Sequence, residues 1–85
     1  MNNRERKEMN GLTREFIRKI EELFNSYRIK VVEAIEKEEE KAEKIEEYFP
    51  SSSRQDEIQE DIDSLEDTLS IFSEAVDMIT EVDYV

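Results

Sequence analysis

An unbroken heptad pattern near the C-terminal end constrains the fold more than any other feature of this sequence. From residue 58 to residue 79, apolar residues recur at alternating steps of four and three, with mostly polar residues between them. The apolar positions are Ile58, Ile62, Leu65, Leu69, Phe72, Val76 and Ile79. A repeat of 3.5 residues is typical of a helix whose apolar seam packs along another helix. The sequence therefore predicts a helix that belongs to a bundle.

Both halves of the chain carry more than one apolar stripe. The helix with the heptad seam has a second stripe near its end, and residues 12–35 contain two stripes. The first of these two consists of Leu12, Phe16, Ile20, Leu23, Tyr27 and Val31. One helix pair cannot cover every stripe, so we expect dimerisation into a four-helix bundle; the alternative is one wide core face within a single hairpin. The residues predicted to self-associate are Ile17, Phe24, Val32, Ile71, Ala75, Met78 and Val82.

Pro50 interrupts the helical pattern, because the residue before a proline is steered away from the α region. Ser51, Ser52 and Ser53 follow it and are candidate N-caps for the next helix. We therefore predict an all-α fold, an antiparallel two-helix hairpin with helices at about 10–48 and 53–82, in a single domain of residues 1–85. Residues 1–9 are polar and are expected to fray, although Asn2 or Asn3 offers a cap for an earlier helix start.

The distribution of charge supports the antiparallel arrangement. The chain has a net charge of −12, but residues 1–30 carry a net +3 and residues 31–85 a net −15. Folding back at Pro50 lays the acidic second helix against the basic start of the first, so that charges of opposite sign meet. The overall negative charge disfavours direct binding to nucleic acid and to anionic membranes.

The composition argues against catalysis. The chain contains no Cys and no His, which removes the commonest general base and the thiolate and imidazole metal ligands. Its serines therefore have no group of this kind to activate them, and we expect a protein that is not an enzyme and uses no cofactor or metal. A short chain without disulfides or metal needs another source of stability, which self-association supplies. No apolar run is long enough to span a bilayer, and we expect a cytoplasmic protein with no membrane partner.

Acidic residues cluster on both sides of the predicted turn. A solvated face that keeps a small bundle soluble is one explanation, and recognition of a basic protein is another. The residues predicted to form such a partner surface are Glu39, Glu40, Glu43, Glu47, Glu57, Glu60 and Asp61. Mimicry of nucleic acid, in which closely spaced carboxylates take the place of phosphates, is a further alternative.

A magnesium enzyme is the remaining alternative. All-helical nucleotide pyrophosphatases hold Mg²⁺ with E-x-x-E on one helix and E-x-x-D on the next, and carboxylate oxygens suit this ion. Glu36 with Glu39, and Glu60 with Asp63, have these spacings. Such spacings also arise by chance in a chain this acidic, so a non-enzymatic, protein-binding hairpin is the expected function.

Three short segments carry a resemblance to a group of known proteins. They are F-I-R-K-I-E-E-L at residues 16–23, E-E-Y-F-P at residues 46–50 and I-D-S-L-E-D at residues 62–67. Together they resemble the small acidic helical-hairpin proteins of Gram-positive phages and prophages, although this chain has a shorter turn and fewer alanines in its second helix. The resemblance implies a protein that works in the cytoplasm of a host cell, by binding and inhibiting a host protein, including defence machinery.

Overall fold

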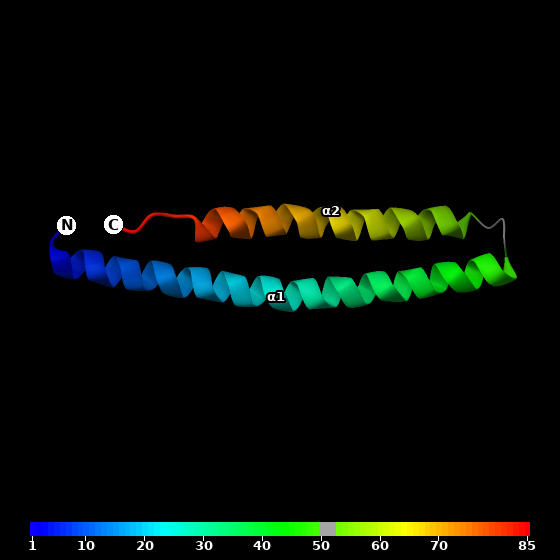
Figure 1. Ribbon diagram of the computed structural model, residues 1–85, viewed down its shortest axis with the longest axis horizontal. Coiled ribbons are helices and arrows are strands. Elements are labelled where there is room, and N and C mark those ends of the chain that lie inside the picture. Colours follow the sequence, from blue (N-terminus) through cyan, green and yellow to red (C-terminus); the bar gives the residue numbers. More distant parts are fainter. Residues whose placement is uncertain (50–52) are drawn as a thin grey trace.

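The computed structural model describes residues 1–49 and 53–85, and these form an all-α hairpin (Figure 1). Helix α1 spans Asn3–Tyr48 and helix α2 spans Arg54–Thr80. The helices run antiparallel, so that both termini lie at one end of a rod whose Cα atoms extend over 69 × 15 × 11 Å. The predicted two-helix fold is confirmed. The predicted break at Pro50 and the candidate caps Ser51 and Ser52 lie outside the described residues.

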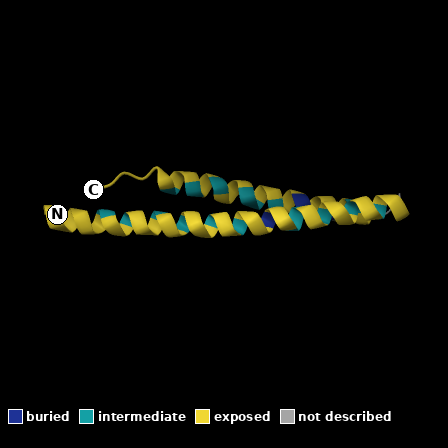
Figure 2. Ribbon diagram, turned by 60° about the horizontal axis from the view of Figure 1, so that its bottom comes forward, coloured by how far each residue is buried: buried dark blue, intermediate teal, exposed yellow. Residues whose placement is uncertain are grey.

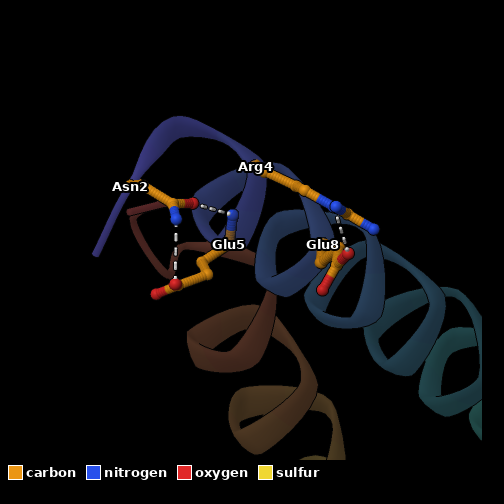
Figure 3. A network of polar contacts seen from close by, with 4 residues as sticks. All are labelled: Asn2, Arg4, Glu5 and Glu8. Carbon is orange, nitrogen blue, oxygen red and sulfur yellow. Dashed lines mark hydrogen bonds and ion pairs between the residues drawn. The ribbon is translucent and has the colours of Figure 1, made fainter.

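Helix α1 begins at Asn3 rather than near residue 10, because its first turn is capped (Figure 3). The Asn2 Oδ1 atom accepts a hydrogen bond from the Glu5 backbone N–H at 2.8 Å, and the Asn2 Nδ2 atom donates to Glu5 Oε1 at 3.0 Å. An ion pair of 3.5 Å joins Arg4 to Glu8 on the next turn. This cap satisfies an N–H group that a helix start leaves without a partner. Residues 3–9, which were expected to fray, are therefore part of α1 in this structure.

The contact between the helices is a seam of half-buried and buried residues from Thr13 to Ile45 on α1 and from Gln55 to Ile79 on α2, with its best-covered part away from the termini (Figure 2). Val31, Ile58 and Ile62 are buried, with exposed fractions of 4%, 7% and 6%. Nearer the termini, the rings of Tyr27 and Phe72 meet edge to face, with centroids 5.4 Å apart. The heptad seam predicted for the second helix is confirmed, since its members are buried or half-buried except Phe72, which makes this ring contact.

On α1 the stripe that faces α2 differs from the first stripe of the sequence analysis. The half-buried side chains follow alternating steps of three and four, at Ile17, Ile20, Phe24 and Tyr27, and continue into buried Val31. By contrast, Leu12, Phe16 and Leu23 remain 59%, 58% and 68% exposed. The first stripe has steps of four, four, three, four and four, which drift around the helix, whereas a long seam needs an average step of 3.5.

The chain ends as an extended tail beside the start of α1. Helix α2 stops at Thr80, slightly before the predicted residue 82. The Asn10 side chain then forms two hydrogen bonds with Val85, donating to its carbonyl oxygen and accepting from its N–H, both at 2.9 Å. The Arg14 guanidinium lies 4.9 Å from the centre of the Tyr84 ring. At the other end of α2, Ser53 is the N-cap residue, but its side chain makes no capping hydrogen bond.

Candidate interaction surface

The hairpin has two halves that differ in how far their apolar side chains are buried. The open half consists of residues 3–30 and 68–85, beside the termini, and the loop half consists of residues 31–48 and 54–67. All three buried side chains belong to the loop half. Most of the exposed large apolar side chains belong to the open half, among them Leu23 at 68%, Ile71 at 64% and Met78 at 71%.

The open half contains an apolar groove of about 270 Å³ between the two helices. Exposed side chains form its rims, and half-buried seam side chains form much of its floor. The lining residues are Ile20, Leu23, Phe24 and Tyr27 of α1 and Phe72, Ala75 and Val76 of α2. Every one of these side chains is apolar or aromatic, so the groove offers a partner no charge and almost no hydrogen bonding.

The loop half contains two overlapping grooves, of about 410 and 390 Å³, that are lined by charged residues. Glu38, Lys41 and Asp61 line both of them. The Lys41 Nζ atom donates a hydrogen bond of 2.8 Å to Glu38 Oε1, and the Glu38 side chain is only 19% exposed. Among the described residues, the ion pairs all lie within α1, and none of them reaches Lys37 or Asp61.

The apolar groove and the charged grooves lie on the same face of the hairpin, which we call the groove face. Residues seven apart hold the same position relative to a heptad seam. On α1, Leu23 lines the apolar groove, and Lys37 and Lys44 line the charged grooves, fourteen and twenty-one residues further on. On α2, Ala75 lines the apolar groove, and Asp61, fourteen residues before it, lines the charged grooves.

Each helix therefore presents an edge row on the groove face that changes from apolar to charged along the rod. On α1 the row at this heptad position reads Met9, Phe16, Leu23, Lys30, Lys37 and Lys44. On α2 two rows, read from the C-terminal end, are Val82, Ala75, Thr68, Asp61 and Arg54, and Met78, Ile71, Ser64 and Glu57. The change falls at the boundary between the open half and the loop half on both helices.

The residues of α1 that were predicted to self-associate do not lie together on one side of the helix. Phe24 lines the apolar groove, although it is half-buried against α2. Ile17 is also half-buried in the seam. Val32 is 43% exposed, but it precedes Glu39 by seven residues and lies on the edge of α1 opposite the groove face. On the groove face of α1, Phe16 and Leu23 are the large apolar residues that remain exposed, and the seven-residue spacing from Met9 is the signal that identifies their row.

On α2 the predicted residues remain together. Ala75 lines the apolar groove, and Ile71, Met78 and Val82 occupy the edge rows beside it. Their exposed fractions are 64%, 71% and 45% for Ile71, Met78 and Val82. Whether a second copy covers them stays a prediction.

The predicted acidic partner surface is divided between two sides of the hairpin. Glu57 and Asp61 line the charged grooves, together with lysines. Glu39 and Glu43, which are exposed, do not line them and lie toward the opposite edge of α1. The remaining members, Glu40, Glu47 and Glu60, are also exposed.

The Mg²⁺ motif of the sequence analysis does not form a recognisable site. Among the described residues, no three carboxylates gather closely enough to hold a metal ion, and this includes Glu36, Glu39, Glu60 and Asp63. The spacing along each helix is present, but the carboxylates of the two helices do not converge.

Comparison with known proteins adds no further constraint. No protein-family model, curated protein sequence or solved structure matches this chain. Within the described ranges, neither helix contains a stretch long and apolar enough to cross a membrane.

Proposed function

We propose that this chain is a non-enzymatic helical hairpin that forms a homodimer and acts by binding another protein. The observation that carries the proposal is the apolar groove of the open half with its exposed rims. An isolated rod would keep these side chains in water, and contiguous exposed apolar surface of this kind marks an interaction site.

Burial of the exposed apolar side chains in the edge rows would supply free energy of association. Phe16, Leu23, Ile71 and Met78 are each more than half exposed. Covering one such side chain contributes on the order of 1–2 kcal/mol, because fully burying a large apolar side chain contributes about 1.5–3 kcal/mol. Two copies bury the set twice, so the groove faces of two open halves supply the core that one hairpin lacks.

The charge of the two halves favours association through the open half. The open half contains eight Lys or Arg and nine Asp or Glu, a net charge of −1. The loop half contains four Lys or Arg and fifteen Asp or Glu, a net charge of −11. Two nearly neutral surfaces approach each other at little electrostatic cost, whereas the strongly acidic loop half stays hydrated and attracts a basic partner.

The proposed binding surface for that partner is the exposed acidic side of α1, formed by Glu39, Glu40, Glu43 and Glu47. The absence of Cys and His supports binding rather than catalysis. The resemblance to phage-encoded hairpins favours a host protein as the target, an inhibitory effect and a location in the cytoplasm.

Sedimentation analysis of single-residue variants tests the dimer. Leu23→Asp places a charge on the rim of the apolar groove and should convert a dimer at tens of micromolar into a monomer. Ile29→Asp is the matched control, because Ile29 is 55% exposed but faces away from both the seam and the groove face. The control should remain a dimer. A monomeric wild-type chain would remove self-association from the proposal.

A capture experiment tests the acidic surface separately. Replacing Glu39 and Glu43 by Gln should weaken binding of a basic protein and leave the dimer intact, because these two side chains lie off the groove face. Isosteric amides preserve the helix. A partner that binds the glutamine variant as well as the wild type would show that the acidic side is only a solvated face.

A further inference from the structure

We propose that, in the homodimer, α2 of the second copy lies along the groove face of α1, with the two-fold axis parallel to the long axis of the rod. The four helices then alternate in direction around the bundle, and both loop ends point the same way. This arrangement rests on the homodimer proposed above and goes beyond it, since self-association alone does not select an orientation.

The edge rows of α1 and α2 are complementary when they face each other. In the open half both rows are apolar as far as Lys30 and Thr68. In the loop half the row of α1 holds Lys37 and Lys44, whereas the rows of α2 hold Asp61 and Glu57 as well as Arg54. The contact of Tyr27 with Phe72 sets the register between the helices. Lys37 lies ten residues beyond Tyr27 and Asp61 lies eleven residues before Phe72, so the two charges stand at nearly the same height along the rod.

A two-fold axis along the rod preserves height and carries each helix onto its own copy, so that α1 of one copy becomes the neighbour of α2 of the other. It therefore places Lys37 of one copy opposite Asp61 of the other, and Leu23 opposite the other copy's Ala75 and Met78, whereas Lys44 meets both Arg54 and Glu57. The two interfaces between the copies thus receive apolar contacts in the open half and the opposite charges of Lys37 and Asp61 in the loop half.

Helix charge in the open half supports the same choice. The part of α1 in residues 3–30 has a net charge of +3, and residues 68–85 have a net charge of −4. The proposed axis brings each basic segment beside an acidic one. The rival arrangement, with the axis perpendicular to the rod, packs α1 on α1 and α2 on α2. In that arrangement like charges lie together, and Lys37 and Lys44 lie outside the region where the two copies overlap.

Repulsion between the two loop halves opposes the proposed arrangement, and its size depends on salt. Acidic side chains such as Glu39 and Glu43 point away from the groove face, so those of the two copies are far apart. At physiological ionic strength, charges are screened beyond about 8 Å, whereas the facing lysines and carboxylates lie within that length. Local attraction therefore prevails at physiological salt, and the dimer should weaken at very low salt.

Charge reversal at one facing pair tests the arrangement. In the Lys37→Glu variant the homodimer sets Glu against Asp61 of the other copy, and in the Asp61→Lys variant it sets Lys against Lys37. Mixing the two variants restores opposite charges at both symmetry-related contacts. The heterodimer should therefore exceed the share expected from random pairing in native mass spectrometry. Random pairing would overturn the arrangement while leaving the homodimer in place.

A distance measurement gives an independent answer. Ser53 is exposed at the loop end of α2, so a spin label on a Ser53→Cys variant reports how far apart the loop ends lie. The proposed axis predicts label distances of about 20–40 Å, whereas the rival arrangement separates the loop ends by about 80 Å, from the 1.5 Å rise per residue. Dimers that show only the long distance would overturn this inference alone. Absence of any dimer would overturn the proposed function as well, and the labelled Leu23→Asp variant supplies the monomer control.

Discussion

The loop half and the open half use the same seam but differ in what flanks it. In the loop half the seam is flanked by charged residues, and Val31, Ile58 and Ile62 are buried between only two helices. In the open half the flanking positions hold residues such as Leu23 and Met78, and no side chain is buried although most large apolar residues lie there.

This difference shows that apolar content and burial are separate properties of a helix pair. Two helices cover one stripe each, and long charged side chains can shield its margins with their apolar stems. A wider apolar face exceeds what one neighbour can cover, so adding apolar residues to the open half increases exposed apolar surface rather than the core. The loop half buries its seam within the hairpin, whereas the open half leaves large apolar side chains exposed beside its seam.

Removing a buried side chain should have the largest effect on stability. Ile62→Ala is expected to lower the free energy of unfolding by about 2–4 kcal/mol, because it leaves a cavity in the loop half. The matched change Ile71→Ala in the open half should cost less than about 0.5 kcal/mol in a monomeric Leu23→Asp background. Urea unfolding followed by circular dichroism measures both. Equal costs would contradict the difference in burial between the halves.

The open half should make stability depend on protein concentration. For a folded dimer, a tenfold rise in concentration adds about 1.4 kcal/mol to the apparent stability, so the Tm of the wild-type chain should increase. Thermal unfolding over two decades of concentration measures this effect. The Leu23→Asp variant should have a constant Tm, and a constant Tm for the wild type would indicate a self-sufficient open half.

A charged residue in the loop-half seam offers a stabilising change. Glu38 lies seven residues after Val31 and seven before Ile45, and its side chain is largely covered. Glu38→Leu should raise the free energy of unfolding by about 1 kcal/mol, since an apolar residue there no longer loses carboxylate hydration. Glu39→Leu, at an exposed neighbouring position, should change stability by less than about 0.5 kcal/mol. Equal gains from both would show that helix propensity, not the seam, is responsible.

The smallest expected effect concerns the glycine inside α1. A Cβ atom added at Gly11 meets no atom within 4 Å. Gly11→Ala should therefore stabilise the open half by about 0.5–1 kcal/mol, through reduced backbone entropy of the unfolded chain. Amide hydrogen exchange of residues 5–15 measures the local gain. No gain would indicate that this first part of α1 unfolds independently of the hairpin.

Sequence reasoning predicted the two helices and the α2 seam because these depend on local signals. The seam from Ile58 to Ile79 is periodic enough to assign without a partner. The start of α1 was placed too late, because the polar residues 1–9 were expected to fray, and Gly11 also lies in this part of the helix. One glycine costs about 1 kcal/mol in a helix, and the Asn2 cap with its Glu5 partner offsets part of that cost.

The same local signals could not show which apolar stripe of α1 faces α2. Leu12, Phe16 and Leu23 are as apolar as Ile17, Ile20 and Phe24, and both sets recur at helical spacing. Only contact with α2 separates them, since the inward set must keep a 3.5-residue period over the whole length of the seam. For the same reason, Val32 was assigned to self-association although it lies on the edge of α1 away from the groove face.

By itself, the amino-acid sequence determined two long helices, the seam of the second helix and the segregation of charge, because propensity, periodicity and net charge belong to local segments. Only the tertiary structure decided which side of α1 faces α2, which apolar and charged rows share the groove face, and where the tail from Glu81 onward lies. These features depend on the angular position of one helix against another, and that position follows from packing two surfaces together.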